Sequence, residues 1–264
     1  MRKIKGKSLN KIEDNTTYFA CIFYLSEGKH TFKNCSFHDC SFRSKVILEN
    51  PRGCEFVNCG FSGDLELDLS RANLDEIPEY VFSLTSLSAL DLSSNNITCI
   101  PRDISKLVHL THLWIFENHI THIPPEIGHL RKLHYLNASI NKIKAVPREM
   151  GKLDNLIELR LRHNQMIEFP LAVTELKNLV YLSLTGNRIR NIPPQIKHLT
   201  KLKKLWCDNN PITEVSEEIK NLQNAVLIDL LWIYFSEKQE RFLQEAFPDS
   251  KLLMTPRDSY FFEK

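Results

Sequence analysis

Four closely spaced histidines are the first residues in this 264-residue chain that could do chemistry, because imidazole is the most common metal ligand in proteins. They are His109, His112, His119 and His122. A zinc ion needs its ligands to converge to about 2 Å from the metal. The elements that carry these histidines therefore decide whether they can form a site.

A second set of candidate ligands is a pair of C-x4-C motifs formed by Cys35, Cys40, Cys54 and Cys59. Thiolates grouped in this way can hold zinc. An earlier copy of the same pattern carries Thr16 and Cys21 in the corresponding columns. We therefore favour buried free thiols that pack as small hydrophobic groups, with zinc ligation and disulfide bonds as the alternatives.

Motifs of catalysis and of cofactor binding are absent from the sequence. No G-x-x-x-x-G-K-[ST], G-x-G-x-x-G, H-E-x-x-H or G-x-S-x-G occurs, and the chain has only eight glycines, so it offers no evident phosphate-binding loop or nucleophile elbow. We predict no catalytic residue and no cofactor, and we expect that the protein is not an enzyme.

The elements that position these residues come from a 23-residue repeat over residues 64–224. Its framework is L-x-x-L-x-L-x-x-N-x-I-x-x-I-P-x-x-I-x-x-L-x-x. The seven copies begin at Asp64, Leu87, Leu110, Leu133, Leu156, Leu179 and Leu202. The pattern resembles the leucine-rich-repeat family, in particular the intracellular type with Ile-Pro in mid-repeat that occurs in Ras-pathway scaffolds. The resemblance implies an α/β solenoid with a parallel β-sheet on its concave face.

Each position of the repeat has a structural role that follows from simple physical chemistry. Alternate leucines of a short strand, such as Leu90 and Leu92, point into the core. The recurring asparagine, such as Asn95, is predicted to bond the unpaired backbone of the turn and of the next repeat. The proline, such as Pro101, suits a convex segment outside the sheet, which then packs a short helix.

The repeat also places the four histidines. His112 lies on the outward face of a strand, whereas His109, His119 and His122 fall in different turn and convex positions. These side chains are therefore not expected to converge, and we predict no metal site.

Residues 12–63 carry a different repeat, of 19 residues. Its four columns are Thr16, Cys35 and Cys54; Tyr18, Phe37 and Phe56; Cys21, Cys40 and Cys59; and Phe23, Phe42 and Phe61. The small-x-aromatic unit resembles the pentapeptide-repeat β-helix. We predict a short three-coil β-solenoid that caps the open apolar end of the first 23-residue repeat.

The two ends of the chain complete the domain plan. Residues 1–11 are predicted to be a basic, solvated tail. Residues 225–264 are predicted to form a C-terminal cap helix and a tail, because Ser236 and Gln239 have the spacing of a capping box and Pro248 ends the apolar stripe that follows.

The outward strand positions of successive repeats define the candidate binding surface, since solenoids of this kind bind partners on their concave face. The predicted partner-binding residues are His112, Trp114, Phe116, Tyr135, Arg160, Arg162, Tyr181 and Trp206. Aromatic side chains beside arginines have the composition of interface hot spots. In the alternative interpretation, the rings only pack against their neighbours and Arg160 pairs with Glu158.

Composition and charge limit the choice of partner and compartment. The 34 basic and 32 acidic residues give a net charge of +2, which does not indicate a nucleic-acid partner. We expect no signal peptide and no membrane span, and the odd number of cysteines favours a reducing compartment, the cytoplasm or alternatively the nucleus. The chain is expected to be monomeric on its own.

We therefore predict a non-catalytic scaffold or adaptor that binds another protein. The resemblance implies a small GTPase, a kinase or a phosphatase as the partner. The alternative is a structural component of a large RNA–protein or cytoskeletal assembly.

Overall fold

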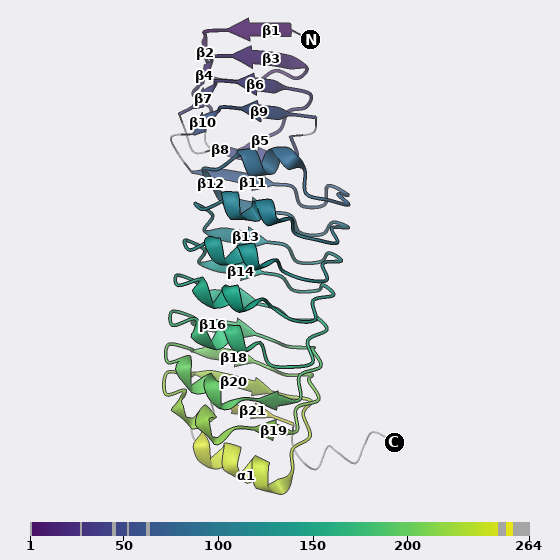
Figure 1. Ribbon diagram of the computed structural model, residues 1–264, viewed down its shortest axis with the longest axis vertical. Coiled ribbons are helices and arrows are strands. Elements are labelled where there is room, and N and C mark those ends of the chain that lie inside the picture. The colour runs from purple at the N-terminus through teal and green to yellow at the C-terminus, as the bar shows by residue number, and fades with distance from the viewer. Residues whose placement is uncertain are drawn as a thin grey trace.

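The computed structural model describes residues 2–26, 28–43, 46–51, 53–61, 64–247 and 252–255. Successive coils stack along one long axis, with strands on one side and short helices on the other (Figure 1). The first coil lies at one end, and α1 lies near the other.

A long parallel sheet runs along the stack, and all its described strand pairs are parallel. Its strands, in spatial order, are β5 (Lys29–His30), β8 (Val46–Glu49), β11 (Leu65–Asp68), β12 (Leu87–Asp91), β13 (His112–Trp114), β14 (Tyr135–Asn137), β15 (Glu158–Arg160), β16 (Tyr181–Ser183), β18 (Lys204–Trp206), β20 (Leu227–Leu230) and β21 (Leu252–Met254). We call its outward surface, formed by the side chains that point away from the core, the sheet face.

The opposite side carries one 3-10 helix in each 23-residue repeat. These are η1 (Glu79–Ser83), η2 (Arg102–Lys106), η3 (Pro125–His129), η4 (Arg148–Lys152), η5 (Leu171–Glu175), η6 (Pro194–His198) and η7 (Glu217–Asn221). A proline precedes each of the first six, because its fixed φ suits the helix entry and its missing N–H is not needed there. In the seventh, Ser216 replaces proline and its side chain accepts a hydrogen bond from the Glu218 N–H.

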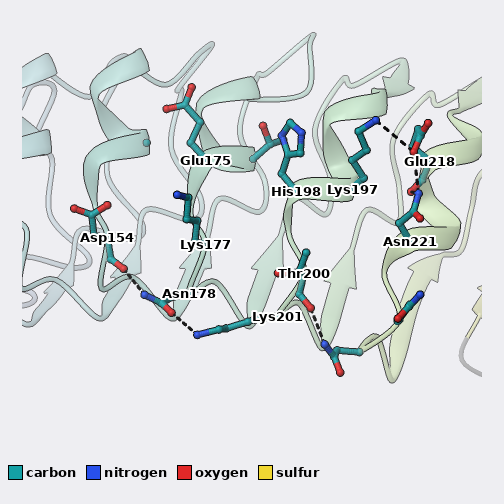
Figure 2. Close-up of a pocket in the computed structure, with 14 residues that line it drawn as sticks. Asp154, Glu175, Lys177, Asn178, Lys197, His198, Thr200, Lys201, Glu218 and Asn221 are labelled. Atoms are coloured by element: carbon teal, nitrogen blue, oxygen red, sulfur yellow. Dashed lines mark hydrogen bonds and ion pairs between the residues drawn. The ribbon is translucent and has the colours of Figure 1, made fainter.

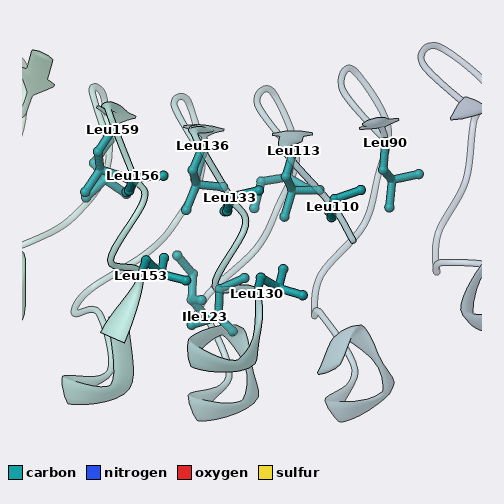
Figure 3. Packing of buried hydrophobic residues seen from close by; sticks show 14 of the residues in the cluster. Leu90, Leu110, Leu113, Ile123, Leu130, Leu133, Leu136, Leu153, Leu156 and Leu159 are labelled. Atoms are coloured by element: carbon teal, nitrogen blue, oxygen red, sulfur yellow. The ribbon is translucent and has the colours of Figure 1, made fainter. Parts of the chain in front are cut away.

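The core lies between the sheet and the 3-10 helices. Leu90, Leu113, Leu136 and Leu159 project inward from four consecutive strands towards the helices (Figure 3). All four are fully buried, as the alternation of the repeat predicts. A single repeat has no second apolar surface to cover these side chains, so stacking makes the array one folding unit.

The recurring asparagine connects adjacent repeats. Asn118 is 5% exposed, and its Oδ1 accepts a hydrogen bond from the Ile97 N–H at 3.0 Å. Its Nδ2 donates to the carbonyl oxygens of Leu92 at 2.9 Å and of Ile115 at 3.3 Å. The predicted structural role is correct, but Ile97 and Leu92 belong to the preceding repeat and not to the next one.

The N-terminal part is a β-solenoid with two further parallel sheets. One consists of β1 (Arg2–Lys5), β3 (Thr16–Phe19), β6 (Ser36–His38) and β9 (Glu55–Val57). The other consists of β2 (Ser8–Leu9), β4 (Ile22–Phe23), β7 (Ser41–Phe42) and β10 (Gly60–Phe61). Phe37 stacks between Tyr18 and Phe56, with centroid distances of 5.2 and 4.9 Å, so the aromatic columns form the core of this cap.

The first eleven residues form an additional coil, so the predicted basic tail is wrong. Ile4 pairs with Tyr18 and Leu9 pairs with Phe23, which places both aliphatic residues on top of the aromatic columns. The spacing between these pairs is 14 residues instead of 19, and this shorter coil hid the repeat.

The sheet face continues from the cap into the 23-residue repeats without a break. β8 pairs in register with β11, and Val46 and Leu48 are fully buried beside Leu65 and Leu67. The cap therefore covers the edge of the first repeat with both backbone hydrogen bonds and apolar side chains.

The C-terminal part adds two strands and a helix. Ile228 and Leu230 in β20 are fully buried, and β21 pairs with β20. Residues 249–264 were predicted to be a tail. Leu252–Met254 form a strand instead, because the backbone edge of β20 offers hydrogen-bonding groups to it; residues 256–264 lie outside the described part.

Helix α1 (Glu237–Ala246) begins at Ser236, whose side chain accepts a hydrogen bond from the Gln239 N–H at 3.3 Å. Gln239 Oε1 does not complete the expected capping box. It accepts from the Val215 N–H at 2.8 Å, next to the two-stranded sheet of β17 (Asn191–Ile192) and β19 (Glu214–Val215). Among the described residues, no helix is long and apolar enough to cross a bilayer.

Candidate protein-binding surface

An aromatic cluster occupies the middle of the sheet face. His112 and Trp114 lie on β13, and Tyr135 lies beside His112 on β14. The Trp114 ring centroid is 5.5 Å from that of His112 and 5.5 Å from that of Tyr135. Parallel pairing fixes this spacing, because corresponding residues on adjacent strands are about 5 Å apart.

Arg160 joins this aromatic cluster from β15. Its Cζ lies 5.5 Å from the Tyr135 ring centroid, within the range of a cation–π contact. Its Nε also donates to Glu158 Oε1 at 2.5 Å. The Arg160–Glu158 pair of the alternative interpretation is therefore present, and it holds the guanidinium beside the ring. Arg160 is still exposed, while Trp114 and Tyr135 are partly buried.

Phe116 and Arg162 are not part of this ring cluster. Each lies two residues beyond the end of its strand, where the chain turns away from the sheet. Phe116 is partly buried, and Arg162 is exposed and forms no ion pair within the described residues. Of the eight predicted residues, these two lie at the margin of the sheet face.

A second aromatic–cation group lies further along the same face. Lys204 Nζ is 5.9 Å from the Tyr181 ring centroid and 5.8 Å from the Trp206 ring centroid. Tyr181 pairs with Glu158 across β15 and β16, so this group and the aromatic cluster form one continuous surface. Lys204 was not among the predicted site residues. Its position in the outward column between two aromatic residues was the available signal.

The N-terminal end of the sheet face is acidic, but a lysine from the cap partly neutralises it. Lys29 Nζ on β5 lies 2.7 Å from Asp68 Oδ2 and 3.2 Å from Glu49 Oε1. Hydrogen bonds to these two carboxylates raise the pKa of Lys29. Partial burial opposes the effect at Asp68, but the bonds from Lys29 and Ser70 outweigh it and lower the pKa of that carboxyl.

A small hollow joins this acidic end to the aromatic cluster. It has a volume of about 180 Å³, and its lining includes Lys29, Asp68, Asp91 and Trp114. The Trp114 side chain is thus a wall between acidic and aromatic surface, and a partner that covers the cluster also meets these carboxylates.

His112 is the titratable ring of the cluster. Burial against its neighbours lowers the pKa of the imidazole, and repulsion from His134 acts in the same direction, while Glu66 opposes both. The neutral ring is therefore the favoured form on this surface near neutral pH.

The other candidate ligands lie apart. His109 Nδ1 accepts from Lys132 Nζ at 2.9 Å, and His122 contacts its neighbour Thr121, so neither meets His112. No group of three or more histidine, cysteine or acidic side chains comes together as a metal site within the described residues. The four paired-motif cysteines are free thiols, and the Cys35 N–H donates to Cys54 Sγ at 3.4 Å in the next coil.

The largest hollow is not on the sheet face. It has a volume of about 1410 Å³ and lies between η5, η6 and η7 and the residues that precede the strands (Figure 2). Its polar groups largely bind each other: Lys197 pairs with Glu218 at 3.6 Å, and Lys201 Nζ donates to Asn178 Oδ1 at 2.7 Å. Because these groups already have partners, this hollow is a weaker candidate site than the aromatic cluster.

Comparisons with known proteins agree with this architecture. The family descriptions "Leucine rich repeat" and "Leucine-rich repeat region" match residues 66–120 and 124–252, which together make up most of the chain. No curated protein sequence matches the chain.

Solved structures with a similar fold come from bacteria and plants. An internalin (inlF) of Listeria monocytogenes has a TM-score of 0.63 at 19% identity, with 91% of this chain and 73% of the internalin covered. A leucine-rich-repeat protein of Leptospira interrogans has a TM-score of 0.52 at 20% identity, with 93% and 90% covered. The ectodomain of the Arabidopsis thaliana receptor kinase GASSHO1/SCHENGEN3 has a TM-score of 0.60 at 20% identity, with 94% and 34% covered. These similarities establish the shared fold.

Proposed function

This chain belongs to the leucine-rich-repeat family, and on that basis we propose that it is a non-catalytic scaffold or adaptor that binds another protein through its sheet face. The fold is commonly a protein-interaction scaffold. The GASSHO1/SCHENGEN3 ectodomain was solved in complex with CASPARIAN STRIP INTEGRITY FACTOR 2, which is a precedent for partner binding by this fold.

The observation that carries the proposal is the aromatic cluster with its cation. Trp114 and Tyr135 leave part of each ring in solvent in the middle of a flat strand array, although neither ring is needed to fill the core. Covering such rings with a partner removes apolar surface from water, and tryptophan, tyrosine and arginine are the residues that most often dominate interface energies.

Pre-organisation of the cluster supports the same proposal. The ion pair with Glu158 and the contact with Tyr135 restrict Arg160 before any partner arrives. Binding therefore loses less side-chain entropy than it would with a free arginine. The contacts that the alternative interpretation took as merely structural are compatible with a binding surface.

The proposed partner is a protein, and the family resemblance favours a small GTPase, a kinase or a phosphatase. The proposed compartment is the cytoplasm, with the nucleus as the second choice. A role in an RNA–protein assembly has less support, because Arg160 is paired with Glu158 and the basic N-terminal segment forms a coil of the cap.

Site-specific photo-crosslinking tests the proposal directly. A photoreactive phenylalanine derivative replaces Tyr135 on the sheet face or, as the matched control, the exposed Tyr24 on the cap. Illumination in cells should link the Tyr135 variant to a discrete partner protein that the Tyr24 variant does not capture. Identical products from both positions, or only RNA at position 135, would contradict the proposal.

A further inference from the structure

A second surface with unpaired charge lies where the chain leaves the sheet. The tenth and twelfth positions of the fourth and sixth repeats are Lys142, Lys144, Arg188 and Arg190, and all four side chains are exposed. None of them forms an ion pair within the part of the chain that the structure describes. We call the lateral surface that carries them the exit face, because it follows the strands.

Backbone hydrogen bonds fix the three repeats of this exit face side by side. The Gln165 N–H donates to the Ile143 carbonyl at 2.9 Å, and the Arg188 N–H donates to the Met166 carbonyl at 2.8 Å. Adjacent coils are therefore about 5 Å apart, and the cations of the fourth and sixth repeats flank the fifth repeat at roughly 10 Å from each other.

The fifth repeat places apolar side chains between these cations. Ile167 is 60% exposed and Leu171 is 53% exposed, although both are large aliphatic residues. They line a hollow of about 790 Å³, which we call the basic groove. Its lining also includes Lys144, Arg148 and Arg188, with Glu168 and Glu175 as its acidic members.

The basic groove differs from the largest hollow in what its groups lack. In the largest hollow, Lys197 and Lys201 already have polar partners. In the basic groove, the Lys144 and Arg188 charges have none among the described residues, and Ile167 has no apolar cover. A ligand that supplies both carboxylates and an aliphatic or aromatic side chain would satisfy the two kinds of group at once.

Nucleic acid fits this surface less well than a peptide does. The exposed floor residues Ile167 and Leu171 are aliphatic, whereas single strands bind by stacking their bases on aromatic rings. The carboxylates of Glu168 and Glu175 on the lining also repel phosphates. Backbone phosphate contacts alone would not use the apolar floor.

We propose that the basic groove docks an acidic segment of a partner protein, with an apolar side chain against Ile167 and Leu171 and flanking carboxylates on Lys144, Arg188 and Arg190. This site is separate from the aromatic cluster, so the scaffold holds two partner regions or two partners at once. The proposal goes beyond the proposed function of the sheet face and does not depend on it.

The test selects ligands from a displayed library of random twelve-residue peptides on the intact protein. Three variants are used: Ile167→Ser, Arg188→Glu, and the matched charge reversal Lys177→Glu beside the largest hollow. All three side chains are exposed, and the melting temperature of each variant verifies its fold. Enriched peptides should combine Asp or Glu with an apolar residue, and their affinity should fall at least about tenfold in the first two variants and remain within about twofold in the third.

Several results would overturn the proposal. Enriched peptides without acidic residues, no enrichment, or equal binding by Ile167→Ser and the wild type exclude this kind of docking. Tighter binding of a twenty-nucleotide single strand, lost in the same variants, assigns the groove to nucleic acid. A self-association that sedimentation detects and that Arg188→Glu abolishes assigns it to a second copy of the chain.

Discussion

The guanidinium of Arg160 lies over the ring of Tyr135, with 5.5 Å between Cζ and the ring centroid. The two residues come from adjacent repeats, so this contact joins two coils across the sheet face. Burial raises the pKa of the Tyr135 phenol, and the positive charge of Arg160 opposes this effect.

This relationship predicts that Arg160→Ala shifts the titration of Tyr135 to still higher pH, because the phenolate loses its nearest cation. The measurement is a pH titration of the tyrosine ring signals by NMR. Arg162→Ala is the matched control, since it removes the same charge from an exposed side chain without a ring contact. Equal shifts in the two variants would contradict the observed geometry.

The asparagine ladder predicts a loss of stability in Asn141→Ala. Asn141 is 8% exposed, its Oδ1 accepts from the Ile120 N–H at 2.9 Å, and its Nδ2 donates to the Ile115 carbonyl at 2.9 Å. Leaving these buried groups without partners should lower the free energy of unfolding by about 1–3 kcal/mol in a urea titration. Asn155→Ala, which removes an exposed amide, should stay within about 0.5 kcal/mol. A similar loss in both variants would argue against a buried ladder.

The cap predicts that deletion of residues 1–63 makes the remaining chain aggregate or melt earlier. The deletion removes β8, so β11 becomes a bare edge strand and Leu65 and Leu67 lose their cover. Thermal melting and light scattering measure the effect. A truncated protein that is monomeric and as stable as the full chain would show that the cap is an independent module.

The pKa of His112 predicts a pH dependence of stability. Its folded-state pKa is lowered, chiefly by burial, so as the pH falls below about 6.5 the unfolded chain takes up the proton first. This contribution to stability is complete above that pH and is lost as the pH drops towards the folded-state pKa. His112→Gln should therefore lose less stability than the wild type between about pH 7.5 and pH 5.5, as urea midpoints would show. His109→Gln, at an exposed site, should follow the wild type.

The comparison of sequence and structure shows which inferences a repeat pattern supports. The inward leucines, the asparagine ladder and the outward columns were predictable, because each depends on a fixed position within an equal period. The first coil was missed, since Ile4 lies 14 residues before Tyr18, whereas the later coils repeat every 19. The strand at Leu252–Met254 was missed for the same reason, because it follows a segment outside the period.

Side-chain partners on the sheet face were harder to predict than the columns. The column of Lys204 was known, but its position over both Tyr181 and Trp206 depends on the conformation of a long side chain. Lys29 lies on the two-residue strand β5, which has no sequence signal of its own, and yet it neutralises Asp68. Long-range pairing of this kind requires the spatial order of the strands.

The central claim, that the aromatic cluster binds a protein partner, is tested most directly by the affinity of Trp114→Ala for the protein that the Tyr135 crosslink identifies. Trp232→Ala is the matched control, because Trp232 is 61% exposed in the turn after β20 and away from the cluster. Truncating a buried aromatic anchor commonly costs about 2 kcal/mol or more, so titration calorimetry should show roughly thirtyfold weaker binding for Trp114→Ala, with an unchanged melting temperature. Trp232→Ala should bind like the wild type. Equal affinities for Trp114→Ala and the wild type would contradict the assignment of the sheet face as the binding surface.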